Sequence, residues 1–425
     1  MCCELLAINT VLAEFKMRLL IVAASINPNS SNIVFIASTP NTGFDSMLYC
    51  YDRPNIVKEK RKQSSVILQE LSKFMIQLSI FDDIRSTSNL KEKIDTISLF
   101  SGCGGMDLGF SQAGFHILWA NDIDKIACDT YERNIGKHIV CGDIQQIDYS
   151  TIPNADLILG GFPCQDFSMI WKRGGITTKR GNLYRNFVEI VAQKEPLMFV
   201  AENVKGLMTA NKGKAIKQIV KDFSTTGNYG YTTNTHLINF ADYGTPQLRK
   251  RVLIVGIRKD IDRRFGIPEP THDEENYVSS SKALFGVEKV KYNNRHQNIQ
   301  SSTVEKLKLI PAGGNFTDIP KDSPHYVKGM ISHVYRRLHP DKPSTTIIAA
   351  GGGGTWGYHY SEPRPLTNRE RARLFGYPDD FVFEGTITEV RRQIGNSVPP
   401  VGIIPFARAI DIYLKQVKAE LCLPI

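Results

Sequence analysis

The sequence predicts an α/β protein with a mixed, largely parallel sheet and a smaller loop-rich domain. From residue 95 onward, short apolar runs alternate with amphipathic segments, as in βαβ units that cover both faces of a sheet. After residue 239 the order changes: a strongly β-branched run at 251–257 follows closely on the run 236–240, which favours an antiparallel hairpin at one edge. Between residues 268 and 334 the periodicity dissolves into polar sequence with several glycines and prolines, which indicates the smaller domain.

The apolar runs place the elements in order along the chain. Parallel strands are expected near residues 96–100, 117–120, 139–141, 157–159 and 198–201, the hairpin at 236–240 and 251–257, and a further extended run at 345–350. Helices are expected from residue 106 and over 125–134, 186–193, 368–375 and 401–415. We therefore expect four regions: an N-terminal extension of unknown role (1–91), a main domain (92–267), the loop-rich domain (268–334) and a segment that completes the main domain (335–425).

Composition is that of a soluble globular protein, with 42% hydrophobic and 22% charged residues. The formal net charge of +9 favours a polyanionic partner. None of the eight cysteines falls in a C-x-x-C pair, so we expect no metal site, no disulfide framework and a reducing cytoplasm. No run reaches the roughly 18 apolar residues of a membrane span, and the short apolar run 19–26 is expected to be a core element.

A glycine turn and two acids suit an adenosine cofactor without a pyrophosphate. The turn Phe100–Gly105 follows the first strand, where backbone N–H groups at a helix start can approach a polar or anionic ligand. Asp122 and Asp143 follow the next two strands, where carboxylates can accept hydrogen bonds from ribose hydroxyls and from an adenine amino group. S-adenosylmethionine fits this set, because its carboxylate can sit at the helix N-terminus. Each acid taken alone could equally be a helix cap or a surface turn.

Cys164 is the candidate nucleophile. It follows a buried strand in the run Gly161-Phe162-Pro163-Cys164-Gln165, and a polar, cationic loop with several glycines comes behind it. A lone cysteine is more often structural, but an exposed cationic setting favours the thiolate. Glu202 ends the neighbouring strand, and Gln247-x-Arg249-x-Arg251 enters the edge strand. Beside a nucleophilic cysteine, these groups can hold a base.

Five ordered motifs resemble those of the cytosine-C5 DNA methyltransferases. They are Phe100–Gly105, Gly161–Gln165, Glu202–Val204, Gln247–Arg251 and the C-terminal run Gln393–Pro399. The resemblance covers residue 95 to the C-terminus and departs from the usual pattern at Asp122, where the family has Glu. It implies a methyltransferase (Rossmann-like) fold and places target recognition in 268–334.

The resemblance also implies a mechanism. Cys164 would attack C6 of a flipped cytosine, Glu202 would hold N3 and the exocyclic amine, and Arg251, with Arg249 nearby, would orient the base. Gln165 and Ser168 would lie in the loop over the substrate. The implied contacts to S-adenosylmethionine are Phe100, Ser101, Gly102, Gly104, Gly105, Asp122, Asp143, Ile144, Pro163, Leu183, Asn396 and Ser397.

Length and the single recognition region resemble bacterial restriction–modification enzymes. We therefore expect a monomer in the bacterial cytoplasm, associated with the nucleoid, that methylates a short sequence in double-stranded DNA, with a cognate restriction endonuclease as a possible partner. An RNA methyltransferase of the same superfamily is an alternative, but it predicts a Cys-Phe-Thr run and no recognition insert. A catalytically inactive relative would have lost Cys164 or Glu202, and a nicotinamide dehydrogenase would have G-x-G-x-x-G.

Overall fold

The computed structural model describes residues 33–35, 49–51, 93–163, 183–326, 328, 334–349 and 357–421. By its contacts the chain divides into two units, Met1–Ser86 and Thr87–Ile425. In the first unit, strands β1 (Ile33–Phe35) and β2 (Tyr49–Tyr51) pair antiparallel. Cys164, Gln165 and Ser168 lie outside the described residues, as do the apolar run 19–26 and most of the N-terminal extension.

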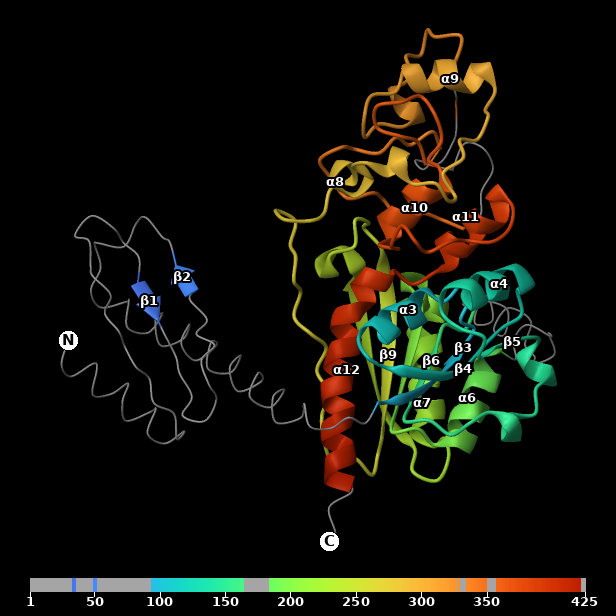
Figure 1. The fold of residues 1–425 in the computed structure, drawn as a ribbon, viewed down its shortest axis with the longest axis vertical. Coiled ribbons are helices and arrows are strands. Elements are labelled where there is room, and N and C mark those ends of the chain that lie inside the picture. The colour runs from blue at the N-terminus through green and yellow to red at the C-terminus, as the bar shows by residue number, and fades with distance from the viewer. Residues whose placement is uncertain are drawn as a thin grey trace. The chain divides into compact units, whose positions relative to one another are not determined.

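A seven-stranded mixed sheet organises the second unit, in the order β5-β4-β3-β6-β7-β9-β8 (Figure 1). The first five strands in this order are parallel, and the last two pair antiparallel at one edge, as the sequence predicts. The strands are β3 (Asp95–Leu99), β4 (His116–Asp122), β5 (Ile139–Cys141), β6 (Leu157–Gly160), β7 (Met198–Val204), β8 (Tyr231–Asn239) and β9 (Lys250–Arg258).

Helices cover both faces of the sheet. On one face, α3 (Gly105–Gln112) and α12 (Pro400–Leu421) pack on apolar strand residues such as Leu159 and Val200. On the other, α6 (Leu183–Lys194) and α7 (Lys214–Ser224) pack on Ile158 and Ile254. Adjacent strand residues thus contribute to different cores, which explains the continuous apolar runs in the sequence. The remaining elements of this part are α4 (Lys125–Asn134), η1 (Ile144–Gln146), η2 (Tyr149–Thr151), η3 (Lys205–Met208), η4 (Ala210–Gly213) and η5 (Phe240–Tyr243).

The loop-rich region forms a smaller body beyond one end of the sheet (Figure 1). It has its own apolar cluster, in which Leu307, Ile310, Phe316 and Ile319 contact Val334 and Tyr358. Its core therefore includes a residue well beyond the expected boundary at 334. The elements of this end of the unit are α8 (Ser280–Leu284), η6 (Val287–Lys289), α9 (Ser301–Lys308), η7 (Phe316–Asp318), α10 (Asn368–Phe375) and α11 (Ile387–Asn396).

The extended run expected at 345–350 does not join the sheet in its described part. Residues 345–349 form no strand, and the segment meets the sheet only through an isolated bridge between Gln247 and Ser344. Its backbone is used differently: the Ile347 N–H donates to the Gln247 side chain at 3.1 Å, and the Ile347 carbonyl accepts from Arg249 at 3.3 Å. The side chains of Gln247 and Arg249 thus bond the Ile347 backbone, which in a strand would bond the backbone of a neighbouring strand. No helix in the described ranges is long and apolar enough to cross a membrane.

Candidate active site at the carboxyl edge of the sheet

The motifs predicted from the sequence meet at one edge of the sheet. Parallel strands end on the same side, so the residues that follow β5, β4, β3, β6 and β7 lie side by side in that spatial order. Strand β9 runs the opposite way and begins at this edge, because Arg251 pairs with Val204. From β5 to β9, the residues at this edge follow one another in space in this order: Asp143, Asp122, the Phe100–Gly105 turn, Gly161–Pro163, Glu202 and Arg251.

The turn after β3 adopts a backbone that few residues tolerate. Phe100 has a φ of 57°, and Gly102 and Gly104 follow at 56° and 88°. A non-glycine residue in this region costs free energy, of order 1–3 kcal/mol, and such strain is concentrated at functional sites. At Gly105 a Cβ atom would lie 2.0 Å from Ser397 Oγ, so only glycine allows the C-terminal segment to approach the turn. Ser397 also hydrogen-bonds the Tyr377 hydroxyl, which in turn contacts Cys103 Sγ at 3.3 Å.

Asp122 joins two loops of the site. One carboxylate oxygen accepts from the Gly102 N–H at 2.8 Å, and the other accepts from the Asp124 N–H at 2.8 Å. Burial raises its pKa, and these two backbone donors oppose the rise. Each oxygen retains a second lone pair for a ligand hydroxyl. The Asp143 carboxylate likewise accepts a hydrogen bond from a backbone group, the Gln145 N–H, at 3.0 Å.

An apolar side chain that the sequence analysis did not single out lies beside Asp122. Ile123 is 69% exposed, which is unusual for isoleucine at the end of a strand. An exposed apolar side chain between two acids offers a surface on which a planar ring can stack. The signal in the sequence was a single isoleucine between Asp122 and Asp124. Together with the strained turn and the Asp122 carboxylate, it fits a nucleoside-type cofactor.

The strand that leads to Cys164 is held in place by Asn203. The Asn203 side chain donates to the Phe162 carbonyl at 2.9 Å and accepts from the Val204 N–H at 2.9 Å. Phe162 itself is buried against Tyr184 and Phe187, and Pro163 is exposed. Asn203 therefore fixes the exit of the chain toward Cys164, a role that the sequence analysis did not assign to it.

Glu202 and Arg251 form an ion pair at this point of the edge. The distance from Arg251 Nε to Glu202 Oε1 is 2.9 Å, and each side chain is 12% exposed. Burial raises the pKa of Glu202, while the nearby Arg251 and Arg249 cations oppose the rise. A carboxyl group whose pKa is raised can hold a proton closer to neutral pH and donate it to a ring nitrogen.

Arg249 has different partners from those expected. Its guanidinium is almost fully buried and donates to the carbonyls of Ile347, Gly395 and Ser397, the last at 2.9 Å. It also lies 4.8 Å from the centre of the Phe375 ring. Burial lowers its pKa to about 9. Arg249 thus ties the edge strand to the C-terminal segment through hydrogen bonds, while its charge also acts on Glu202.

Two of the three cysteines described in the second unit are buried thiols with raised pKa values. Burial raises the pKa of Cys103 to about 11 and raises that of Cys128 as well. Cys141 is exposed but lies on edge strand β5, three strands away from β6. A thiol with a raised pKa carries little thiolate near neutral pH. Neither buried thiol competes with Cys164 for the role of nucleophile.

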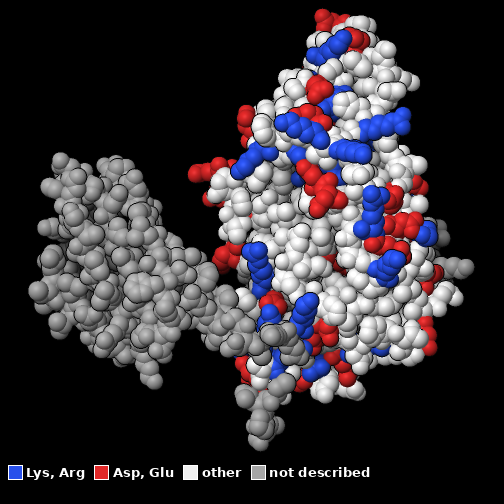
Figure 2. All heavy atoms as spheres, viewed as in Figure 1, with Lys and Arg blue, Asp and Glu red and all other residues white. Residues whose placement is uncertain are grey.

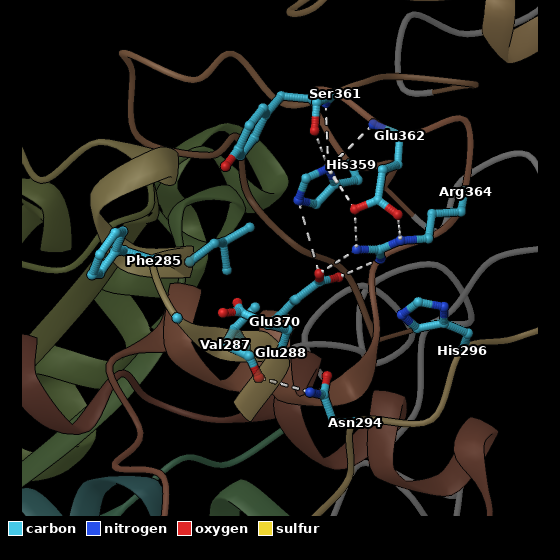
Figure 3. Close-up of a pocket in the computed structure, with 13 residues that line it drawn as sticks. Phe285, Val287, Glu288, Asn294, His296, His359, Ser361, Glu362, Arg364 and Glu370 are labelled. Atoms are coloured by element: carbon cyan, nitrogen blue, oxygen red, sulfur yellow. Dashed lines mark hydrogen bonds and ion pairs between the residues drawn. The ribbon is translucent and has the colours of Figure 1, made fainter. Parts of the chain in front are cut away.

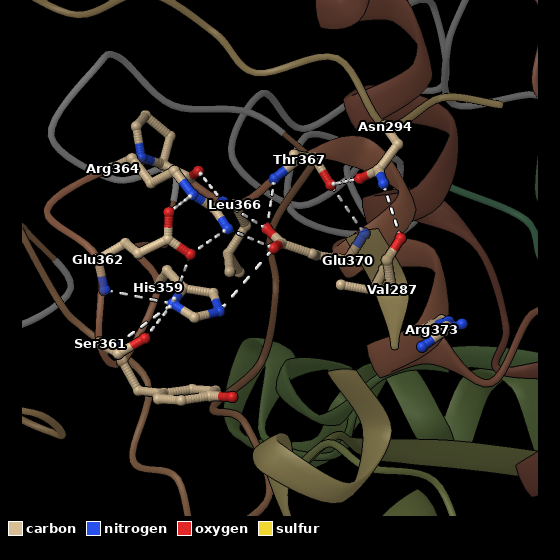
Figure 4. A network of polar contacts seen from close by, with 12 residues as sticks. Val287, Asn294, His359, Ser361, Glu362, Arg364, Leu366, Thr367, Glu370 and Arg373 are labelled. Carbon is tan, nitrogen blue, oxygen red and sulfur yellow. Dashed lines mark hydrogen bonds and ion pairs between the residues drawn. The ribbon is translucent and has the colours of Figure 1, made fainter. Parts of the chain in front are cut away.

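A polar cavity of about 370 Å³ lies in the smaller body, between the 284–288 segment and residues 359–364 (Figure 3). Arg364 contacts Glu362 at 2.9 Å and Glu370 at 2.8 Å, and Glu370 accepts the Thr367 N–H at 2.7 Å (Figure 4). His359 Nδ1 accepts from two backbone N–H groups, and burial lowers the His359 pKa. These polar groups bond one another, and through Thr367 and Glu370 they stabilise the start of α10. The network contributes no group to the sheet edge.

Comparison with known proteins identifies a family that matches most of the chain. The family model described as C-5 cytosine-specific DNA methylase matches residues 94–411. The chain is 58% identical over 336 residues to the type II methyltransferase M.NgoFVII of Neisseria gonorrhoeae, covering 77% of this chain and 88% of that protein. It is 44% identical to M.BbvI of Brevibacillus brevis, over 72% of this chain and 87% of that protein.

Solved structures share the fold. A DNA modification methyltransferase encoded within an Escherichia coli prophage aligns with a TM-score of 0.60 at 24% identity, over 75% of this chain and 98% of that one. A methyltransferase of Entamoeba histolytica aligns with a TM-score of 0.53 at 16% identity, over 78% of this chain and 100% of that one. The family match spans most of the chain and includes every element of the sheet edge. This chain belongs to the C-5 cytosine-specific DNA methylase family and is a DNA (cytosine-5-)-methyltransferase.

Proposed function

We propose that this enzyme methylates C5 of one cytosine within a specific short sequence of double-stranded DNA, and that it protects host DNA from a cognate restriction endonuclease. The observation that carries the proposal is the largely buried ion pair between Glu202 on β7 and Arg251 on β9, beside the exit of β6 toward Cys164. The relatives at 58% and 44% identity are named as type II methyltransferases, which supports the restriction–modification role. We further propose that it acts as a monomer in the bacterial cytoplasm, on nucleoid DNA.

Methylation of C5 requires a nucleophile, a proton donor and a group that orients the base, and we assign these roles to Cys164, Glu202 and Arg251. C5 of cytosine is a weak nucleophile within an aromatic ring, and thiolate attack at C6 turns C5 into an enamine carbon. We assign the attack to Cys164, which requires that the cytosine leave the base stack. Glu202 would donate its proton to N3 as negative charge develops on the ring, and Arg251 would hold Glu202 and the base in register. The enamine C5 would then take up the methyl group, after which a base would remove the C5 proton and Cys164 would be expelled as the C5–C6 double bond re-forms.

The cofactor side of the edge supports S-adenosylmethionine. Asp122 would accept the ribose hydroxyls, Asp143 the adenine amino group, and Ile123 and Ile144 would contact the adenine ring. The Phe100–Gly105 turn would receive the amino-acid end, with Pro163, Leu183, Asn396 and Ser397 around it. Bound S-adenosylmethionine supplies the methyl group. Its expected place after β3 and β4 is next to Gly161–Pro163 after β6, so donor and nucleophile would face the same base.

The target sequence would be read by the smaller body, which we assign to residues 268–334 with the contribution of Tyr358. Its cations Lys289, Lys291 and Arg295 suit contacts to DNA phosphates. Arg249, in contrast, is assigned to positioning: it holds Gly395 and Ser397 against the cofactor turn.

Bisulfite sequencing of DNA from cells that express the chain tests the proposal. We expect one cytosine to be protected from conversion in every copy of a short sequence, and that result also identifies the sequence. DNA without any protected cytosine would contradict the proposed function.

Duplex DNA that carries 5-fluorocytosine at the target position tests the covalent step separately. Fluorine at C5 prevents release of the C5 proton, so the adduct through Cys164 accumulates and survives denaturing electrophoresis. We expect the adduct with the wild-type enzyme and none with Cys164→Ser. A Cys141→Ser variant serves as the control, because Cys141 is an exposed thiol on β5, three strands away from β6.

A further inference from the structure

Five lysines follow β7 within a single stretch of chain. They come from η3, η4 and α7, and all five are exposed: Lys205, Lys212, Lys214, Lys217 and Lys221. We call these five residues the lysine surface. None of them forms an ion pair with another described residue, and no acidic residue occurs between Glu202 and Asp222. The stretch therefore concentrates positive charge that the fold itself does not neutralise.

Several lysines elsewhere in the described chain are neutralised by a neighbouring acidic side chain. Lys308 pairs with Glu305 at 2.8 Å, Lys415 with Asp411 at 2.8 Å and Lys418 with Asp156 at 2.9 Å. On the face drawn in Figure 2, basic and acidic side chains are interspersed. On α7, by contrast, Lys214, Lys217 and Lys221 are spaced so that they repel one another.

The packing of α7 fixes the direction of these side chains. Ala215, Ile219 and Phe223 are buried on the sheet, which leaves the row from Lys214 to Lys221 on the outer side. With a rise of about 1.5 Å per residue the row is roughly 10 Å long. The chain enters η3 directly from Glu202 and Val204 at the carboxyl edge, and α7 then leads back to the start of β8 at the opposite edge. Lys205 is three residues from Glu202, and Lys221 is the most distant member.

We propose that the lysine surface binds the phosphate backbone of duplex DNA flanking the target sequence on one side, beside Glu202. This inference rests on the proposed function, because it takes the DNA to be positioned by a cytosine held at Glu202. A phosphate backbone is the partner that a row of unpaired lysines fits by charge, and lysine contacts to phosphate carry no sequence information. The surface would therefore increase affinity for long DNA without changing which sequence is methylated.

The experiment compares DNA length on each side of the site. Three duplexes contain the sequence identified by bisulfite sequencing: one that ends close to it, and one extended on each side in turn. We expect the wild-type enzyme to bind one extended duplex more tightly than the other two. The variant Lys205→Gln/Lys212→Gln/Lys214→Gln should lose that gain and bind the short duplex as before. The slope of log Kd against log salt on the favoured duplex should fall by roughly 2–3, near 0.9 for each lost phosphate contact.

The control variant removes the same charge from the opposite end of the domain: Lys259→Gln/Lys415→Gln/Lys418→Gln. If both triple variants change the salt slope equally, or if no extended duplex is favoured, the lysine surface is an ordinary solvated face and the inference is wrong. The proposed function fails on a different result, which is the absence of methylation of the short duplex by the wild-type enzyme. Unchanged kcat of the lysine variant on the short duplex shows that its active site is intact.

Discussion

Glu202 and Arg251 are joined by an ion pair of 2.9 Å across the antiparallel strands β7 and β9. Arg251 also donates from its guanidinium to the Lys250 carbonyl at 2.9 Å. The carboxyl group is therefore oriented before any ligand arrives, and its remaining lone pairs are available at the edge. Burial raises the pKa of Glu202, and the charges of Arg251 and Arg249 oppose that rise.

Replacing Glu202 with glutamine should slow methylation by roughly 100-fold or more, because glutamine keeps the shape but cannot transfer a proton to N3. Single-turnover methylation measures the step directly. The raised pKa of Glu202 gives the sign of the pH dependence: the wild-type rate of this step should fall as pH rises through that pKa, and the Glu202→Gln rate should not show this fall. Glu195→Gln is the matched control, because Glu195 caps a turn at the other end of the sheet. Equal loss of rate in both variants would contradict the assignment.

Arg249→Ala should destabilise the protein more than it affects chemistry. Three buried carbonyls lose their donor and a cavity opens beside Phe375, which together should cost roughly 3 kcal/mol or more of unfolding free energy. Urea denaturation measures this loss. Arg251→Ala should do the reverse, with a larger loss of kcat and a smaller loss of stability. If Arg249→Ala is as stable as the wild type, the hydrogen bonds from Arg249 to the three carbonyls do not stabilise the fold and the positioning role is wrong.

Asp122→Ala should raise KM for S-adenosylmethionine by roughly 10-fold to 100-fold. The Gly102 and Asp124 N–H groups lose their hydrogen-bond acceptor, and so do the ribose hydroxyls of the cofactor. Isothermal calorimetry with S-adenosylhomocysteine measures the same loss without turnover. Asp148→Ala is the control: Asp148 caps η2 through the Ser150 N–H in the same way but lies away from the turn. An unchanged affinity in Asp122→Ala would remove this residue from the cofactor site.

The sequence was most informative where local pattern and fold agree. The predicted strand 139–141 and helices 125–134 and 368–375 are confirmed with their limits. The hairpin is also confirmed: β8 and β9 pair antiparallel, although η5 lies in the segment that connects them. The extended run at 345–350 is apolar enough for a strand, yet the Ile347 backbone bonds the side chains of Gln247 and Arg249 instead of a neighbouring strand. Periodicity records how apolar a segment is, but not which groups satisfy its backbone.

The site shows the same limit. Motif order identified Asp122, Glu202 and Arg251, and the sheet brings them to one edge. The sequence could not show that Arg249 turns to Gly395 and Ser397, since those contacts span nearly 150 residues. Nor could it show that Ile123 is exposed, because isoleucine at a strand end is ordinarily buried.

Asn203→Ala should impair the covalent step while leaving cofactor affinity unchanged. Without the bond to the Phe162 carbonyl, the exit toward Cys164 is no longer fixed. We expect the 5-fluorocytosine adduct to form at least 10-fold more slowly, because small displacements of a nucleophile are costly. Calorimetry with S-adenosylhomocysteine should give the wild-type Kd. If affinity and adduct formation decline together, Asn203 supports the whole edge rather than the nucleophile.

Asp107 should make stability depend on pH. Its buried carboxylate accepts from Ser98 and from Tyr131, each at 2.7 Å, and burial raises its pKa from an ordinary 3.8 to about 6. His138 contacts the Tyr131 hydroxyl at 3.0 Å and is the other titratable group in the network. A raised folded-state pKa contributes stability that is complete below the unfolded value and is lost as pH rises through about 6. The stability of the wild type relative to Asp107→Asn should therefore fall by roughly 1 kcal/mol between pH 5 and pH 7.5. Urea denaturation across this range measures the difference, and His138→Gln separates the contribution of the histidine. A difference that does not vary with pH would show that the Asp107 carboxyl group titrates at its ordinary value despite its burial.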